Sequence, residues 1–277
     1  MSQPRRYLVN CSIMFGELEL LERPAAARAA GFDAIEFWWP FASSAPTERE
    51  VDQFVAAIRD AGVQLVGLNF AAGDMASGER GLLSWPGRES EFRDSLAVAC
   101  GIGVLLGTSA FNALYGLRLD GVSAQQQDDV AMENLVHAAH AAARVGAKVL
   151  LEPVSGAPRY PLLTADHVVA LIERVEAAHD VRNVALLADL YHLSVNGDDV
   201  GRALSLHHAR VGHVQIADAP GRHEPGSGDL DLDRYLDALA ATGYPGWIGL
   251  EYAPSSTTID SLAWLPPDQR AAGLSTR

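Results

Sequence analysis

Residues 184–189 read VALLAD, five apolar residues followed by the acid Asp189. The run has the length of a buried strand, and a carboxylate at the end of such a strand needs compensation of its charge. Short, largely apolar runs also close on Glu152, Gln215 and Glu251, at spacings of 37, 26 and 36 residues along the four positions. The pattern predicts successive parallel strands whose carboxyl ends bring polar groups together.

These four strand-end residues offer three carboxylates and one amide, so that each supplies an oxygen donor. Oxygen donors are the ligands that hard divalent cations prefer. If the strands bring them together, Glu152, Asp189, Gln215 and Glu251 predict a divalent-cation site, for Mg²⁺ or Mn²⁺.

Strand-like and helix-like segments alternate along the sequence. The predicted strands are 7–11, 34–38, 64–70, 108–114, 148–152, 184–189, 211–217 and 247–252. The predicted helices are 18–30, 47–61, 88–101, 125–145, 164–178, 198–207, 230–242 and a last segment from 258 onward. Eight units without a linker predict the α/β class and a single (β/α)8 TIM barrel over residues 1–277. A doubly wound open sheet is the alternative; the eightfold count and the lack of a Gly-rich dinucleotide-binding sequence after the first strand disfavour it.

Composition narrows the classes of partner. The chain has 277 residues, 48% of them hydrophobic, and a formal net charge of −14, which argues against a nucleic-acid partner. Cys11 and Cys100 are too few for a disulfide scaffold, and free thiols fit a reducing cytoplasm. The opening residues 1–6 lack the pattern of a signal peptide, and no apolar run has the length of a membrane span. We therefore expect a cytoplasmic protein with no membrane partner.

Further polar side chains fall at strand ends, where the active sites of barrels lie. They are Asn69, Asn112, Tyr115, His192 and Arg222, and they are candidate substrate-binding residues. The two longest loops, 71–87 and 220–228, follow the third and seventh strands on the same face. Each residue alone has an ordinary structural explanation, such as a helix cap, a packed histidine or a solvent loop. Their joint occurrence favours a site.

Several stretches give the chain a family resemblance. They are NCSIMFGE at 10–17, AGDMASGERG at 72–81, PGRESEFRD at 86–94, DLYH at 189–192, GHVQIAD at 212–218, HEPGSG at 223–228 and GLEY at 249–252. On these motifs the chain resembles the xylose-isomerase-like TIM barrels, and among them the hydroxypyruvate isomerases. The motifs run through nearly the whole chain, and the long ones at 73–81 and 215–228 are specific.

The resemblance implies roles for particular residues. Glu152, Asp189, Gln215 and Glu251 would be the metal ligands, with Glu152 and Glu251 also acting as the two proton-transfer carboxylates. His192 and Arg222 would contact the substrate. The related ketose 3-epimerases usually have histidine at the place of Gln215, which favours the isomerase branch. Two positions depart from the family pattern: Ser155 and Leu117 stand where relatives commonly or sometimes have asparagine.

The implied reaction moves a proton between adjacent carbons of a small keto-acid or sugar. The cation would polarise the carbonyl and stabilise an enediolate, while the two glutamates transfer the proton. Arg222 would meet the carboxylate of an anionic substrate such as hydroxypyruvate. The family also implies a homo-oligomer, either a dimer or a tetramer.

Three alternatives remain open. The first is a ketose 3-epimerase or an isomerase of a four-carbon oxo-acid on the same site. The second is an endonuclease-like barrel, which needs a multi-zinc cluster with several histidines and a basic face; only His192 and His213 lie near the relevant strand ends. The third is a non-catalytic binding barrel, which the full set of ligands and both glutamates disfavours.

Overall fold

Eight parallel strands close into a barrel in sequence order in the computed structural model, which describes residues 5–271. The strands are β1 Arg6–Asn10, β2 Ala34–Phe37, β3 Gln64–Asn69, β4 Ala110–Asn112, β5 Lys148–Leu151, β6 Val184–Asp189, β7 Val211–Ile216 and β8 Trp247–Leu250. Pairing of β1 with β8 completes the ring. This confirms the predicted TIM barrel; the first four residues of the opening segment lie outside the described residues.

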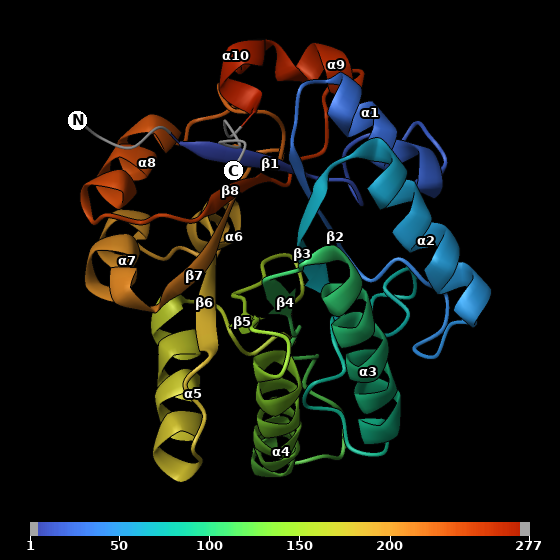
Figure 1. Ribbon diagram of the computed structural model, residues 1–277. Helices are drawn as coiled ribbons and strands as arrows, with labels where there is room; N and C mark the ends of the chain where they lie inside the picture. Colours follow the sequence, from blue (N-terminus) through green and yellow to red (C-terminus); the bar gives the residue numbers. More distant parts are fainter. Residues whose placement is uncertain (1–4, 272–277) are drawn as a thin grey trace.

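Helices surround the strands (Figure 1). They are α1 Arg23–Ala29, α2 Glu48–Ala61, α3 Glu89–Leu106, α4 Ala124–Ala143, α5 Ala165–Ala178, α6 Leu190–Val195, α7 Val200–His207, α8 Leu232–Ala241, α9 Thr258–Ser261 and α10 Pro267–Arg270. The capping box predicted at Thr47 and Glu50 is present at the start of α2. Within residues 5–271 no helix combines the length and the apolar character that crossing a membrane requires.

Helix α3 corrects one predicted boundary. The sequence predicted an end at Gly101, but the helix continues to Leu106 and ends at Gly107, whose φ of 71° is left-handed. Gly103 lies inside the helix at a place where the Phe111 ring leaves no room for a side chain: a Cβ there would lie 2.8 Å from Phe111 Cζ. A glycine inside a helix can therefore serve packing rather than termination.

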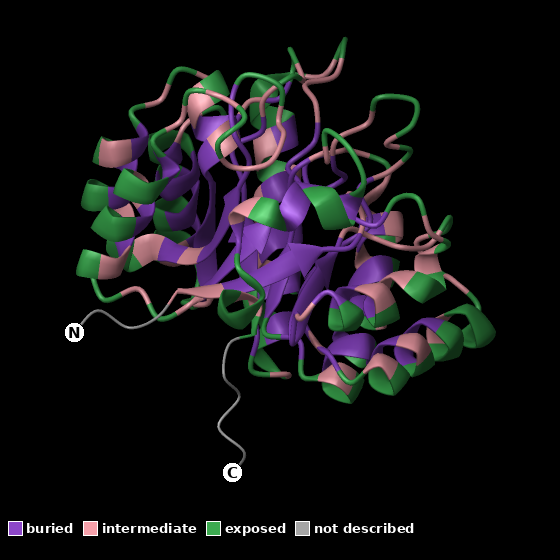
Figure 2. Cartoon of the chain, turned by 90° about the horizontal axis from the view of Figure 1, so that it is seen from above, coloured by how far each residue is buried: buried purple, intermediate pink, exposed green. Residues whose placement is uncertain are grey.

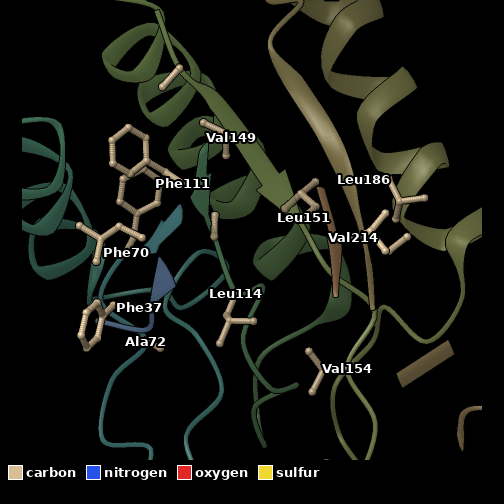
Figure 3. Packing of buried hydrophobic residues seen from close by; sticks show 14 of the residues in the cluster. Phe37, Phe70, Ala72, Phe111, Leu114, Val149, Leu151, Val154, Leu186 and Val214 are labelled. Carbon is tan, nitrogen blue, oxygen red and sulfur yellow. The ribbon is translucent and has the colours of Figure 1, made fainter. Parts of the chain in front are cut away.

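The core fills the barrel and the layer between strands and helices. Buried residues concentrate at the centre and exposed residues on the outer faces of the helices (Figure 2). Phe70 and Phe111 (both labelled in Figure 3) stack with their ring centroids 5.3 Å apart. Phe92 of α3 packs edge-on against Phe70. These aromatic contacts tie α3 to β3 and β4, the strands below the long loop at 71–87.

The structure also adds an element at the end of β6. Helix α6 begins directly after Asp189, whose Oδ1 accepts hydrogen bonds from the backbone N–H groups of Tyr191 and His192. The sequence predicted only one helix here, starting at Asp198. The short α6 fixes His192 at the mouth of the barrel, one turn from the end of its strand.

Candidate active site and metal site

The barrel brings the four predicted ligand residues to its carboxyl end. Glu152 and Glu251 stand one residue beyond β5 and β8, Asp189 ends β6, and Gln215 is the fifth residue of β7. The register places Asp189 opposite Gln215. All four side chains are buried.

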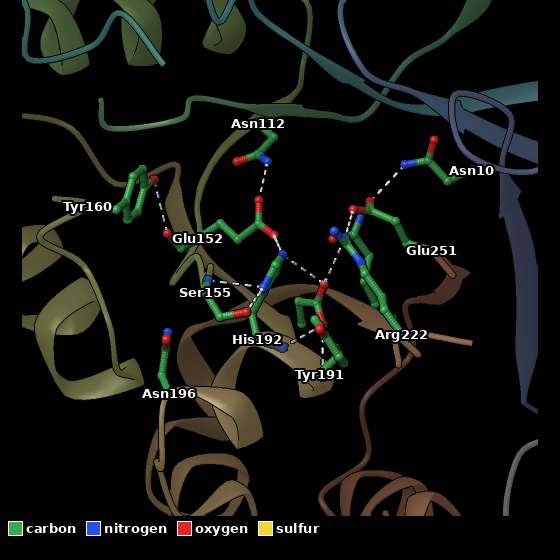
Figure 4. Close-up of polar contacts among 12 residues, drawn as sticks. Asn10, Asn112, Glu152, Ser155, Tyr160, Tyr191, His192, Asn196, Arg222 and Glu251 are labelled. Carbon is green, nitrogen blue, oxygen red and sulfur yellow. Dashed lines mark hydrogen bonds and ion pairs between the residues drawn. The ribbon is translucent and has the colours of Figure 1, made fainter. Parts of the chain in front are cut away.

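Glu152 and Glu251 differ in their partners (Figure 4). Glu152 Oε2 accepts a hydrogen bond of 2.8 Å from Asn112 Nδ2. Glu251 Oε2 accepts from Asn10 Nδ2 at 2.8 Å, and its Oε1 lies 2.6 Å from Arg222 Nη2. Burial raises the pKa of both glutamic acids, and the neighbouring acids raise it further. A cation bound beside these two buried acids would therefore stabilise their ionised forms.

The amide nitrogen of Gln215 is occupied by two carboxylates, which leaves its oxygen without them. Nε2 donates to Glu36 Oε1 at 2.8 Å and to Glu251 Oε2. Two carboxylates on one side require the NH₂ group to face them, which turns Oε1 away. Gln215 Oε1 and Asp189 Oδ2 are buried oxygens without a hydrogen-bond partner among the described residues.

This donor set fits a metal ion. Ligand atoms of Glu152, Asp189 and His192 lie within 4.8 Å of one another, and this buried group could hold a cation. Orphaned buried oxygens cost free energy unless a donor or a cation meets them. A divalent cation would compensate both the acids and the unpaired oxygens.

His192 is held from behind by the loop after β5. Its Nδ1 accepts the backbone N–H of Ser155 at 3.0 Å and lies 2.7 Å from Ser155 Oγ. Burial lowers the pKa of His192 to about 4, so the ring is neutral near pH 7. A neutral ring that accepts at Nδ1 carries its hydrogen on Nε2, which lies 3.8 Å from Glu152 Oε1 and 3.7 Å from Asp189 Oδ2.

Arg222 is fixed in a left-handed conformation with a φ of 59°. Its backbone N–H donates to Asp218 O, and its carbonyl accepts from the N–H of Ala253. The guanidinium pairs with Glu251 and lies 3.8 Å from Asp189 Oδ2. A strained backbone held by several hydrogen bonds is typical of functional positions. Because the guanidinium pairs with Glu251 and lies near Asp189, the acids of the site already balance the charge of Arg222.

A cavity of about 560 Å³ opens above these residues. That volume falls within the range of small-molecule sites. Its lining comes from opposite sides of the barrel mouth: Trp38, Asn69, Met75, Ala76, Arg80, Leu114, Glu152, Val154, Ser155, Gly156, Tyr191, His192, Val195, Arg222 and Glu251. Asn69 thus lies where the sequence predicted a substrate contact.

Two of the predicted substrate-binding residues lie elsewhere. Asn112 is not part of the lining and supports Glu152 from below. The Tyr115 hydroxyl donates to Asp128 of α4, and Tyr115 is not part of the lining. Asn112 Oδ1 is a further buried oxygen without a hydrogen-bond partner among the described residues, and contact of either residue with a substrate stays a prediction.

Sequence reasoning missed Glu36, a buried acid in β2. Its Oε2 lies 2.7 Å from His213 Nε2, and its Oε1 accepts from Gln215. Gly67 and Gly249 make room for it, because a Cβ at either position would lie 3.1 Å or 2.6 Å from a Glu36 oxygen. The same signal that marked the other strands, an acid in an apolar run, was present at 34–37.

Comparisons with known proteins agree with this architecture. The pattern of the xylose isomerase-like TIM barrel family matches residues 24–267. A Streptomyces coelicolor protein named "Putative hydroxypyruvate isomerase" is 51% identical over 273 residues, covering 97% of this chain and 98% of its own. The 2-oxo-tetronate isomerase of Cupriavidus necator is 36% identical and the hydroxypyruvate isomerase of Escherichia coli 31% identical, each covering 95% of this chain and 98% of its own.

Solved structures give the same fold. A Brucella melitensis protein described as an AP endonuclease, family 2, has a TM-score of 0.84 at 34% identity, covering 94% of this chain and 97% of its own. A D-allulose 3-epimerase from Methylomonas has a TM-score of 0.72 at 19% identity, covering 95% and 90%, and this likeness concerns the fold alone. Within residues 5–271 the group with metal-ligand geometry contains one histidine, His192, whereas the endonuclease alternative needs several.

Fold, site and relatives define one class: the chain belongs to the xylose isomerase-like TIM barrel family. Within that family it is an isomerase of the hydroxypyruvate isomerase group.

Proposed function

We propose that the enzyme interconverts hydroxypyruvate and tartronate semialdehyde through an enediolate. The observation that carries the proposal is the pair of buried glutamates at the floor of the cavity, which flank the unpaired oxygens of Asp189 and Gln215. Paired carboxylates around a planar intermediate are suited to moving a proton between adjacent carbons.

We assign the metal ligands to oxygens of Glu152, Asp189, Gln215 and Glu251. The alternative ligand His192 would need a lone pair on Nε2, which would place the ring hydrogen on Nδ1, against the N–H of Ser155. His192 Nε2–H is therefore better suited to donate to a substrate oxygen. A bound Mg²⁺ or Mn²⁺ would supply Lewis-acid polarisation of the substrate carbonyl.

The glutamates perform the proton transfer. One carboxylate removes a proton from C3 of hydroxypyruvate, and the hydroxyl proton moves from O3 to O2. The other carboxyl, protonated at the start, delivers its proton to C2, which gives the aldehyde at C3 and a hydroxyl at C2; proton exchange with solvent then restores both glutamates. Arg222 holds Glu251 in place during both steps.

A second candidate substrate is a four-carbon 2-oxo acid. The relative from Cupriavidus necator is named a 2-oxo-tetronate isomerase and is 36% identical. A cavity of about 560 Å³ has room for one more hydroxymethylene group than hydroxypyruvate carries. The same groups would act on C2 and C3, so only the length of the substrate differs between the candidates.

The test is a proton-exchange assay by NMR in D₂O. The metal-stripped protein receives hydroxypyruvate, 2-oxo-tetronate, D-fructose or D-tagatose, then Mg²⁺ or Mn²⁺. Metal-dependent conversion of a 2-oxo acid, with both ketoses inert, is the expected result. Exchange on the ketoses alone would move the substrate to the epimerase class, and no exchange on any compound would contradict the proposed chemistry.

A further inference from the structure

Arg80 is a cation on the wall of the cavity. It lies in the loop between β3 and α3 and lines the cavity. Its Nη1 donates to the carbonyls of Met75 at 2.9 Å and Glu79 at 2.7 Å. Within residues 5–271, Arg80 takes part in no ion pair, and its Nε and Nη2 donate no hydrogen bond to the protein.

The neighbouring acids are occupied by other partners. Glu79 Oε2 lies 2.8 Å from Arg88 Nη1 and accepts the N–H of Asp74 at 2.6 Å. Asp74 Oδ1 accepts the N–H groups of Ala76 and Ser77. These bonds occupy Glu79 Oε2 and Asp74 Oδ1, so the guanidinium of Arg80 remains available.

The backbone beside Arg80 is anchored to the segment after β4. The Arg80 carbonyl accepts the N–H of Gly116 at 3.1 Å. Gly81, with a φ of 112°, passes so close to Leu114 that a Cβ would meet its carbonyl oxygen. The guanidinium is therefore carried on a fixed support, which lowers the entropic cost of binding a ligand.

The two arginines of the cavity differ in whether an acidic side chain pairs with them. Arg222 pairs with Glu251 through Nη2, although its buried Nε has no partner; among residues 5–271 Arg80 pairs with no acid and donates from neither Nε nor Nη2. Those two N–H groups form the planar fork that fits both oxygens of a carboxylate. An anionic substrate enters a site that contains three acids, so it needs a cation set apart from them.

We infer that Arg80 binds the carboxylate of a 2-oxo acid and selects anionic substrates over neutral sugars of the same length. The inference rests on the proposed isomerase site and names its specificity-determining residue. Arg222 is then left to hold Glu251. This assignment replaces the expectation that Arg222 meets the substrate carboxylate.

Binding of a matched pair of ligands tests the inference without turnover. Pyruvate and hydroxyacetone share a methyl ketone and differ in having a carboxylate or a hydroxymethyl group. NMR titration of metal-loaded protein compares the wild type with Arg80→Met, Arg80→Lys and the control Arg49→Met, an exposed arginine on α2. We expect Arg80→Met to weaken pyruvate binding roughly 10- to 100-fold and to leave hydroxyacetone binding unchanged. Arg80→Lys should fall between, and Arg49→Met should match the wild type.

The outcomes separate this inference from the proposed function. Equal weakening of both ligands would assign Arg80 to loop structure, and unchanged pyruvate binding would remove it as the carboxylate contact. Absence of pyruvate binding by the wild type would also overturn the inference. Hydroxypyruvate turnover is measured in parallel: an inactive wild type that still binds pyruvate through Arg80 contradicts the proposed reaction but not the carboxylate site.

Discussion

Glu152 and Glu251 occupy equivalent places one residue beyond their strands, yet their surroundings differ. Within the described residues Glu152 receives one hydrogen bond, from the neutral amide of Asn112. Glu251 receives hydrogen bonds from two amides and an ion pair from Arg222. Within those residues Glu152 Oε1 accepts no hydrogen bond, whereas both oxygens of Glu251 already have partners.

The difference indicates how the two glutamates divide the reaction. Among residues 5–271 Glu152 Oε1 accepts no hydrogen bond, and His192 Nε2 lies 3.8 Å from it, so this oxygen is available to a substrate proton. Both oxygens of Glu251 already have hydrogen-bond or ion-pair partners, and burial raises the pKa of Glu251 to about 8 although Arg222 lowers it, so this group can carry the proton that is delivered to C2. We therefore propose that Glu152 removes the proton from C3 and that Glu251 acts at C2.

The largest expected effect comes from exchanging each glutamate for its amide. Glu152→Gln and Glu251→Gln should each lower isomerisation roughly 1,000-fold or more with the fold intact, because each removes a proton-transfer group. Deuterium exchange at C3, followed by NMR, should vanish in Glu152→Gln and persist in part in Glu251→Gln. The reverse pattern would exchange the two roles, and near-normal activity in either variant would contradict its role altogether.

The second largest effect on activity is expected when the ion pair between Arg222 and Glu251 is removed. Arg222→Met leaves Glu251 buried without its cation, and we expect roughly a 100-fold loss of kcat/KM. Because Arg222 acts through Glu251, the loss should be similar for hydroxypyruvate and for its neutral counterpart, dihydroxyacetone. Steady-state kinetics on both substrates measure it. A loss confined to hydroxypyruvate would restore Arg222 as the carboxylate contact and sharpen the contrast with Arg80.

A variant of Glu36 tests what orients the Gln215 amide beside Glu251. Glu36→Gln can turn its own NH₂ toward Gln215 and so remove the reason for the Gln215 amide to keep Oε1 in the site. We expect Mn²⁺ affinity, measured by electron paramagnetic resonance titration, to weaken roughly 10- to 100-fold. Glu48→Gln on the exposed face of α2 is the matched control. Unchanged affinity in Glu36→Gln would show that Gln215 is oriented without it.

The smallest effect on activity is expected for Tyr115, which does not line the cavity. Tyr115→Phe removes the hydrogen bond to Asp128 outside the cavity. We expect kcat and KM to stay within about twofold of the wild type and the free energy of unfolding to fall by about 1 kcal/mol. Urea denaturation and steady-state kinetics measure the two quantities. A large rise in KM would return Tyr115 to the substrate site.

The alternation of strands and helices was readable from the sequence because each unit carries its own signals. Acids or amides at the ends of apolar runs marked Glu152, Asp189, Gln215 and Glu251, and the structure places all four at one end of the barrel. The same reading did not mark Glu36, and it placed Tyr115 by its distance from a strand end rather than by the direction of its side chain.

Local sequence thus determined the barrel, its strand ends and the residue types available to hold a metal, because caps, glycines and apolar periodicity act between neighbours in the chain. Only the tertiary structure decided which atoms those residues offer. Glu36 and Gln215 are 179 residues apart, yet their contact fixes which end of the amide faces the site. The unpaired N–H groups of Arg80 and the hydrogen bond from Tyr115 to Asp128 likewise depend on how the loops pack once the barrel has closed. The direction of a side chain is set by such contacts, and the local sequence pattern does not predict them.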